Sequence, residues 1–260
     1  MEKQLWALIL GASSGFGEAT SLELSKLGYN IFGVHLDRRA TLPHVEEIVR
    51  QIRQAGREAV FFNVNASDPQ KRKDVAASIG AQFQKTPGTI RVLLHTLAFG
   101  TLQPFVGEGA VTQAQMDMTS DVMGHSLIYW VQEVVHAGLM EQGGRIYTMT
   151  SSGGTRVMPS YGPVSGAKAL VESHIRQLAM ELAPRGITAN AIRAGVTETP
   201  SSKKIPGYDQ IAAAAVARNP HGRLTTTQDV AKAIGVLAHP NTYWITGNVI
   251  GVDGGEDIIG

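Results

Sequence analysis

A tyrosine and a lysine stand seven residues apart in the stretch SYGPVSGAK, as Tyr161 and Lys168. The stretch has the pattern of a helix, in which seven residues turn the chain by about 700°, so both side chains return close to one face. A phenol can donate a proton, and an ammonium group favours negative charge on a neighbouring oxygen. The pair could therefore serve a reaction in which charge develops on a substrate oxygen.

A second motif, LGASSGFG, brings Gly11, Gly15 and Gly17 directly after the first predicted strand, where a helix begins. Glycines allow a tight turn and let the backbone approach a pyrophosphate, and the helix N-terminus offers free N–H groups to that anion. The spacing is Gly-x3-Gly-x-Gly rather than the common Gly-x-Gly-x2-Gly. The position favours a dinucleotide loop, with an ordinary tight turn as the alternative.

The elements that must position these residues alternate along the chain. Short apolar runs without polar alternation predict strands buried on both faces, at Trp6–Leu10, Asn30–Leu36, Ala59–Val64, Val92–Leu97, Arg145–Thr150, Thr188–Ile192 and Asn248–Val252. Amphipathic stretches predict helices at Gly17–Leu27, Leu42–Ala55, Pro69–Gln84, Met116–Glu141, Ser165–Ala183 and Thr227–Ala238. This order predicts an α/β fold, a doubly wound parallel sheet of about seven strands with helices on both faces. We expect one domain over residues 1–260.

Composition narrows the classes of function. The 23 Lys and Arg nearly cancel the 22 Asp and Glu, which gives no support to nucleic-acid or membrane binding. The chain has no cysteine, so disulfides and thiolate chemistry are excluded, and we expect a cytoplasmic protein. The first apolar run is too short for a signal peptide or a membrane span. The histidines form no metal-binding motif, so no metal site is expected.

The glycine spacing, the chain length and the late motif NVIGVDGG resemble the short-chain dehydrogenase/reductase family over essentially the whole chain. The resemblance implies a Rossmann-type domain, a nicotinamide cofactor, and catalysis by a tyrosine and a lysine of one helix. Most members carry Tyr-x3-Lys, but that tyrosine position here holds Val164. Tyr161 lies about 4.5 Å further along a helix axis than the usual tyrosine.

Tyr-x6-Lys resembles the bacterial enoyl-acyl-carrier-protein reductases. In enoyl thioester reduction the hydride reaches Cβ and charge develops on the more distant thioester oxygen, which fits a displaced proton donor. The stretch His95–Phe99 and the position of Asp121 agree with this branch. Ser151 departs from it, since many of these enzymes have a further tyrosine there.

The resemblance assigns roles to individual residues. Tyr161 would hydrogen-bond the developing enolate oxygen, and Lys168 would hold the cofactor ribose. The predicted cofactor-binding residues are Gly11, Ser13, Ser14, Gly15, Phe16, Gly17, Arg38, Arg39, Asn63, Val64, Thr96, Ala98, Lys168, Gly195, Val196 and Thr199. The predicted substrate-binding residues are Phe99, Ser151 and Tyr161.

The choice between NADPH and NADH depends on the end of the second strand. His35 occupies the position of the acid that binds the adenosine ribose in NAD-preferring relatives, and Asp37 follows two residues later. Arg38 and Arg39 could bind a 2′-phosphate, which favours NADPH. NADH is the alternative, because a small shift of register would place Asp37 at the ribose.

These observations predict an NAD(P)H-dependent enoyl-acyl-carrier-protein reductase of fatty acid synthesis. The segment 197–219, hereafter the lid, would cover the acyl chain, and the substrate would be an acyl thioester on acyl carrier protein. The alternatives are a carbonyl reductase or alcohol dehydrogenase of the same fold, and a catalytically silent cofactor-binding protein. A homotetramer is expected from the resemblance alone.

Overall fold

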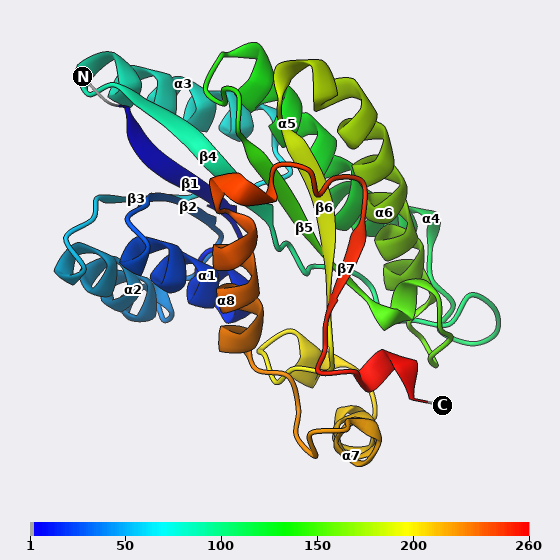
Figure 1. The fold of residues 1–260 in the computed structure, drawn as a ribbon. Helices are drawn as coiled ribbons and strands as arrows, with labels where there is room; N and C mark the ends of the chain where they lie inside the picture. The colour runs from blue at the N-terminus through cyan, green and yellow to red at the C-terminus, as the bar shows by residue number, and fades with distance from the viewer. Residues whose placement is uncertain (1–2, 260) are drawn as a thin grey trace.

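The computed structural model describes residues 3–259 and centres on a seven-stranded, wholly parallel sheet in the order β3-β2-β1-β4-β5-β6-β7 (Figure 1). The strands are β1 (Gln4–Leu10), β2 (Asn30–His35), β3 (Ala59–Asn63), β4 (Gly88–His95), β5 (Arg145–Ser151), β6 (Thr188–Ala194) and β7 (Val249–Val252). The predicted doubly wound sheet is confirmed. The strand order reverses between β1 and β4, and a crevice at such a point is the usual ligand site of open α/β sheets.

Helices cover both faces of the sheet (Figure 1). The helices are α1 (Gly15–Lys26), α2 (Leu42–Gln54), α3 (Pro69–Lys85), α4 (Gln113–Ser120), α5 (Ser126–His136), α6 (Gly162–Leu182), α7 (Tyr208–Arg218) and α8 (Thr227–Leu237). Short 3-10 turns lie at η2 (Ser152–Gly154), η3 (Ala183–Arg185), η4 (Ser202–Lys204), η5 (Pro240–Thr242) and η6 (Glu256–Ile258). Apolar residues of α3, α5 and α6 pack on one face, and those of α1, α2 and α8 pack on the other.

Strand β1 shows why the apolar runs have no polar alternation. Trp6, Leu8 and Leu10 face the core under α5 and α6, whereas Ala7 and Ile9 face the core under α1 and α8. All five are fully buried because both faces of the strand are covered.

The long helix predicted over Met116–Glu141 is divided in the structure. Helix α4 begins with a capping box formed by Thr112 and Gln115, and a π-helical turn, η1 (Asp121–His125), separates it from α5. Helix α5 ends at His136, shortly before Gly138, which has a φ of 66°. Such π-turns often occur at functional sites, and this one brings Met123 to the cavity described below.

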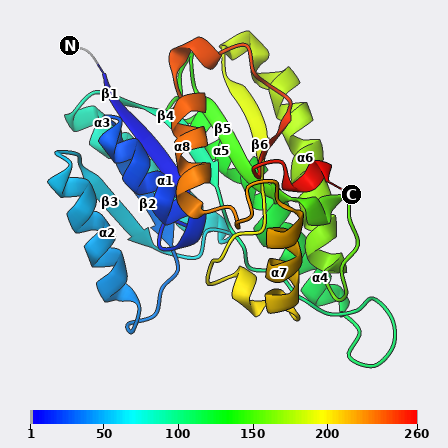
Figure 2. The ribbon, with the colours of Figure 1, turned by 60° about the horizontal axis from the view of Figure 1, so that its bottom comes forward.

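The lid, in which the sequence predicts no helix or strand, contains regular structure. It contains η4 and the eleven-residue helix α7, which lies beyond the carboxyl ends of the strands (Figure 1) and comes forward in Figure 2. A parallel β-bridge joins Thr197, the first residue of the lid, to Thr225, which lies six residues beyond its end. The alanines of α7 account for its helical structure, since alanine is the best helix former.

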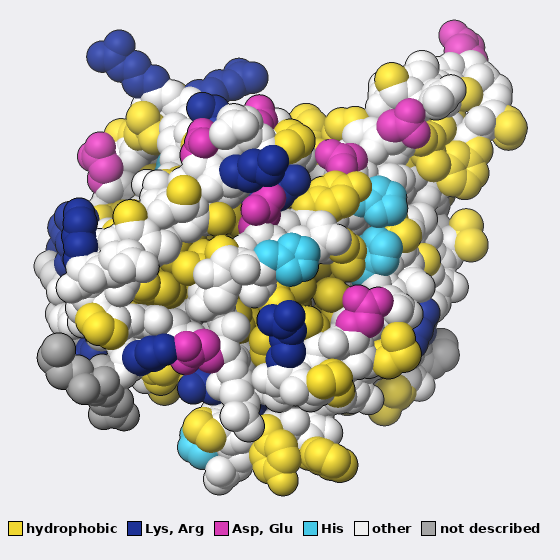
Figure 3. Space-filling model, turned by 90° about the horizontal axis from the view of Figure 1, so that it is seen from above, with side chains coloured by type: hydrophobic (Ala, Val, Ile, Leu, Met, Phe, Trp, Pro, Cys, Tyr) yellow, Lys and Arg dark blue, Asp and Glu magenta, His cyan; other side chains and the backbone are white. Residues whose placement is uncertain are grey.

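On the face in Figure 3, basic and acidic side chains are interspersed. This distribution agrees with a formal net charge of +1. Within residues 3–259, no helix combines the length and the apolar character needed to cross a membrane.

Candidate active site

A cavity of about 310 Å³ lies at the carboxyl ends of the strands. Its walls come from the start of α1, the loops after β4, β5 and β6, the π-turn η1, α6 and the lid. Many of the predicted site residues line it, namely Phe16, Thr96, Ala98, Phe99, Ser151, Tyr161, Lys168, Gly195, Val196 and Thr199. The fold thus brings these predicted residues from five separate stretches of the chain to one cavity.

Tyr161 caps the N-terminus of α6 rather than lying within the helix, so its predicted helical position is wrong by one residue. The preceding Ser160 has a φ of 60° and is the one non-glycine residue between 3 and 259 with a positive φ. The Tyr161 ring packs on Gly153, where an added Cβ would lie 2.4 Å from Cε1 of the ring. A positive φ such as that of Ser160 strains the backbone of a non-glycine residue, and such strain is often found at active sites, where the surrounding structure maintains it.

The Tyr161 hydroxyl lies 3.4 Å from the Ser151 Oγ, so two hydroxyls meet in the wall of the cavity. Burial raises the pKa of Tyr161, and the hydrogen bond with Ser151 partly offsets that effect. The phenol is therefore protonated at neutral pH and can donate to a substrate oxygen.

Lys168 is buried beneath the cavity, and its Nζ donates to the carbonyl oxygen of Met149 at 2.8 Å. Burial lowers the pKa of Lys168 to about 8, and the negative charge of Glu172 opposes this shift. The Glu172 carboxylate is held in turn by the Thr150 hydroxyl, which donates to Oε1 at 2.6 Å. The lysine is thus largely charged at neutral pH, in a place where a nearby oxyanion would be favoured.

Val164 occupies the tyrosine position of the commoner motif and lines the same cavity. It is buried in a small cluster with Met123, Tyr161 and Ala167. No proton donor can act from this position, so Tyr161 is the phenol available on this part of the cavity wall.

His95 ends β4 behind this wall. Its ring nitrogens lie 3.1 Å from the Thr148 Oγ1 and 2.9 Å from the Ser126 Oγ. Burial, and then the positive charge of Lys168, lower the pKa of His95 to about 3. The imidazole is neutral at physiological pH and anchors the wall rather than carrying charge.

The glycine loop has the features of a dinucleotide cradle. Gly11 has a φ of 93°, and a Cβ there would lie 2.6 Å from the Thr96 Oγ1. A Cβ on Gly17 would lie 2.0 Å from the Gly11 carbonyl oxygen, so only glycine allows α1 to start this close to the loop. Ser14 is the N-cap of α1 but makes no side-chain cap bond. The first N–H groups of the helix are therefore available for a phosphate, which fits a pyrophosphate group.

The loop after β6 closes the other side of this cradle. A Cβ on Gly15 would lie 3.5 Å from the Thr199 Cγ2, although the two residues are far apart in the sequence. Ser202 fixes this loop, because its Oγ accepts from the Thr199 N–H at 2.9 Å and donates to the Thr197 carbonyl oxygen at 2.8 Å. Gly195 and Val196 belong to the same loop.

At the adenosine end, the predicted groups are engaged within the protein. The Asn63 side chain accepts from the Asp37 N–H at 2.9 Å and donates to the Asp37 carbonyl oxygen at 3.0 Å. The Val64 N–H donates to the His35 carbonyl oxygen at 2.8 Å. Cofactor binding by Asn63 and Val64 stays a prediction, and it would require these bonds to be exchanged.

Asp37 itself lies beside the glycine loop. Burial acts to raise its pKa, but hydrogen bonds from Ser13, Thr41 and His35 outweigh burial and lower it. Arg38 and Arg39 are exposed, and among the described residues neither side chain has an ion-pair partner. The carboxylate is thus already bonded, whereas the two arginines have no counter-charge.

Sequence reasoning missed two groups of lining residues. Gly100, Leu102, Met158, Ile205 and Ile211 give the cavity apolar walls. Tyr208, the first residue of α7, also lines the cavity, and its hydroxyl is buried without a hydrogen-bond partner. Apolar positions in loops and in the lid carry no motif, so only the folded arrangement reveals them.

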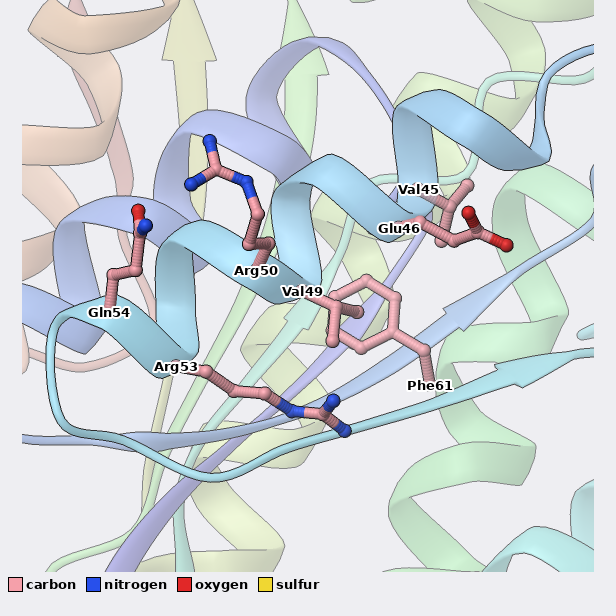
Figure 4. Close-up of a pocket in the computed structure, with 7 residues that line it drawn as sticks. All are labelled: Val45, Glu46, Val49, Arg50, Arg53, Gln54 and Phe61. Carbon is pink, nitrogen blue, oxygen red and sulfur yellow. The ribbon is translucent and has the colours of Figure 1, made fainter.

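A second cavity, of about 520 Å³, lies between α2 and β3 and shares no residue with the first (Figure 4). Its walls are Val45, Glu46, Val49, Arg50, Arg53, Gln54 and Phe61. It holds no pair of groups suited to catalysis, and Arg50 is bound to Glu47 on the same helix. The cavity at Tyr161 and Lys168 is therefore the candidate active site.

The strand order, the glycine loop and the tyrosine–lysine pair together define a short-chain dehydrogenase/reductase. The sequence model of the family described as enoyl-(acyl carrier protein) reductase matches residues 11–256, and the chain belongs to this family of NAD(P)-dependent oxidoreductases.

Curated relatives of this chain include reductases of different substrates. An NADPH-dependent aldehyde reductase-like protein of the chloroplast from Arabidopsis thaliana is 28% identical, over 96% of this chain and 93% of its own. A 1-cyclohexenylcarbonyl-CoA reductase from Streptomyces collinus is 28% identical, over 97% of this chain and 87% of its own.

Solved structures agree in fold. The enoyl-[acyl-carrier-protein] reductase (NADH) from Aquifex aeolicus VF5 superposes with a TM-score of 0.86 at 24% identity, covering 100% of this chain and 98% of its own. The enoyl-(acyl-carrier-protein) reductase from Anaplasma phagocytophilum, in complex with NAD, gives a TM-score of 0.84 at 20% identity, covering 100% and 94%.

Proposed function

We propose that this protein reduces the carbon–carbon double bond of trans-2-enoyl thioesters with a nicotinamide cofactor, giving saturated acyl thioesters in fatty acid synthesis. The observation that carries the proposal is the pairing of Tyr161 at the cap of α6 with a valine at the usual donor position. The family description and the Streptomyces relative, a reductase of an unsaturated thioester by its name, support it.

The chain's own residues divide the work in this proposal. The glycine loop and the start of α1 hold the pyrophosphate, and Lys168 holds the ribose and keeps positive charge under the site. When bound, the reduced cofactor supplies the hydride that is transferred to Cβ. Tyr161, with Ser151 beside it, donates hydrogen bonds to the thioester oxygen as negative charge develops there. The enolate then takes a proton at Cα, which comes ultimately from solvent, and the saturated thioester results. The apolar lid walls exclude water from the acyl chain.

NADPH is the preferred cofactor in this proposal. Arg38 and Arg39 are exposed next to the adenosine end, and within residues 3–259 neither has an ion-pair partner, whereas Asp37 already accepts several hydrogen bonds. A 2′-phosphate would give the arginines a bidentate partner. Preference for NADH would instead require Asp37 to exchange its present bonds for the ribose.

The carrier and the assembly stay predictions from the resemblance. Acyl carrier protein is the expected carrier of the acyl group, a homotetramer the expected assembly, and the cytoplasm the expected compartment. Of the two lysines near the lid entrance, Lys203 is paired with Glu198, and Lys204 lines the cavity.

A carbonyl reductase is the second candidate, and the Arabidopsis relative, named as aldehyde reductase-like, favours it. A spectrophotometric assay with crotonyl and acetoacetyl thioesters, each with NADPH and NADH, separates the two. We expect oxidation of NADPH with crotonyl thioester and little with acetoacetyl thioester. Faster reduction of the β-keto substrate would overturn the proposal.

A further inference from the structure

Glu256 is a buried carboxylate that does not touch the cavity. It lies in η6 near the C-terminus and is only 3% exposed. One carboxylate oxygen, Oε2, accepts from the Val196 N–H at 3.0 Å. The other, Oε1, accepts from the Arg218 guanidinium at 3.3 Å. Each oxygen of a buried charge thus has a partner, as such a charge requires.

The two partners belong to different walls of the site. Val196 lines the cavity in the loop that also carries Thr199, and the resemblance places both residues among those that bind the cofactor. Arg218 is the last residue of α7, whose first turn contributes Tyr208 and Ile211 to the cavity. One carboxylate therefore joins the loop expected to hold the cofactor to the lid.

Side chains pack closely around Gly195, which lies next to this link. A Cβ on Gly195 would lie 2.7 Å from the Glu256 Oε2. This gives Gly195 a structural reason to be glycine that is independent of any cofactor. The end of the lid is held a second time, because the Asn219 side chain donates to the Asp253 carbonyl oxygen at 2.9 Å.

The next residue extends the link to a third wall. The Asp257 carboxylate lies 3.0 Å from Arg156, in the loop that leads to Tyr161, and 3.0 Å from Arg193 at the end of β6. The segment 253–257 thus connects the Tyr161 loop, the β6 loop and the lid, with Glu256 as its most buried charge.

We propose that Glu256 is a positioning residue that couples the lid helix to the cofactor loop through Val196 and Arg218. The coupling holds the lid wall at a fixed position relative to the bound cofactor. Glu256 itself makes no contact with the reacting atoms. The kinetic part of this inference rests on the proposed function, whereas the structural coupling does not.

Amide hydrogen exchange of the full chain, without substrate, tests the coupling directly. In Glu256→Gln and in Arg218→Met we expect the amides of residues 208–218 to exchange about tenfold faster, because a charge-assisted bond at the end of the helix is lost. The double variant should exchange no faster than either single one, since both remove the same link. Arg218→Lys, which keeps the charge, should stay close to the parent protein.

Arg223→Met is the matched control. Arg223 lies five residues beyond Arg218, and its guanidinium forms an ion pair with the Asp229 carboxylate at 2.6 Å. The substitution breaks this pair, which does not involve the cofactor loop. We expect it to leave the exchange of 208–218 unchanged. Exchange in Glu256→Gln and Arg218→Met equal to that in Arg223→Met would overturn the proposal, and so would equally faster exchange throughout the sheet. If Glu256→Gln does not fold, Arg218→Met and Arg218→Lys decide the matter alone.

Kinetics give a second readout. In Arg218→Met we expect the KM for crotonyl thioester to rise about fivefold while kcat stays within about twofold, as for a residue that places the lid rather than reacts. A fall in kcat with an unchanged KM would contradict a positioning role. If the enoyl thioester is no substrate at all, the proposed function fails while the exchange experiment still tests the coupling.

Discussion

The two ends of the site are built differently. At the Tyr161 end, the reactive side chains are buried and hydrogen-bonded within the protein. The Tyr161 hydroxyl pairs with Ser151, and Lys168 donates to the Met149 carbonyl oxygen. At the adenosine end, Arg38 and Arg39 are exposed. Groups held in a low-dielectric surrounding have perturbed pKa values and fixed geometry, whereas exposed charges are screened and mobile. We propose that the buried side chains at the Tyr161 end fix the substrate chemistry and that a few exposed side chains set the cofactor preference.

Removal of the Tyr161 hydroxyl should give the largest effect. In Tyr161→Phe we expect kcat for crotonyl thioester to fall about a hundredfold, as when one oxyanion donor is lost, with the melting temperature nearly unchanged. Adding Val164→Tyr should not restore activity, because the new hydroxyl would sit nearly a turn away. Steady-state kinetics check both variants, with the exposed Tyr243→Phe as control. Turnover close to the parent value in Tyr161→Phe would place the donor elsewhere.

Replacement of the two arginines should give a smaller, cofactor-specific effect. In Arg38→Ala/Arg39→Ala we expect the KM for NADPH to rise about tenfold while the KM for NADH changes little, since only NADPH has a 2′-phosphate. Arg185→Ala, at another exposed arginine, is the control. Equal changes for both cofactors, or parent activity with NADH alone, would contradict the assignment of NADPH.

The pH dependence should report the buried lysine. Because burial lowers the pKa of Lys168 to about 8, its charge, which the mechanism needs, is present below that pH and is lost above it. We expect kcat/KM to fall as the pH rises through this value. Glu172→Gln removes the carboxylate that raises the pKa of Lys168, so that pKa should drop further. We therefore expect kcat/KM to begin falling at a lower pH and to be a few-fold below the parent value at pH 8.

The exposed Glu181→Gln on the same helix should leave the profile unchanged. A profile for Glu172→Gln that coincides with that of the parent protein would show that Glu172 does not act on Lys168.

The orphan hydroxyl of Tyr208 should give the smallest effect. It is buried without a hydrogen-bond partner, so Tyr208→Phe should leave the melting temperature equal or slightly higher. We expect the KM for crotonyl thioester to rise by a factor of about three, because a donor on the lid wall is lost. An unchanged KM would mean that this hydroxyl makes no contact with the substrate.

Some parts of the structure were predictable from the sequence and others were not. Buried strands such as β1 produce continuous apolar runs, and the glycine loop has a local motif, so both were predicted within a few residues. The cap position of Tyr161 and the π-turn at Asp121 depend on packing between α4 and α6, which no local pattern encodes. The link of Glu256 to Val196 joins residues 60 apart in the sequence, so only the folded chain reveals it.

The central claim is that the displaced tyrosine selects an enoyl thioester over a carbonyl substrate. The most direct measurement is a competition in one vessel between crotonyl and acetoacetyl thioesters at equal concentration, with NADPH deuterated at the transferred position. Mass spectrometry then identifies the product that carries the deuterium. We predict butyryl thioester labelled at C3, with little labelled 3-hydroxybutyryl thioester, because a donor misplaced by an ångström already costs about a hundredfold. Labelled 3-hydroxybutyryl thioester as the main product would contradict the claim.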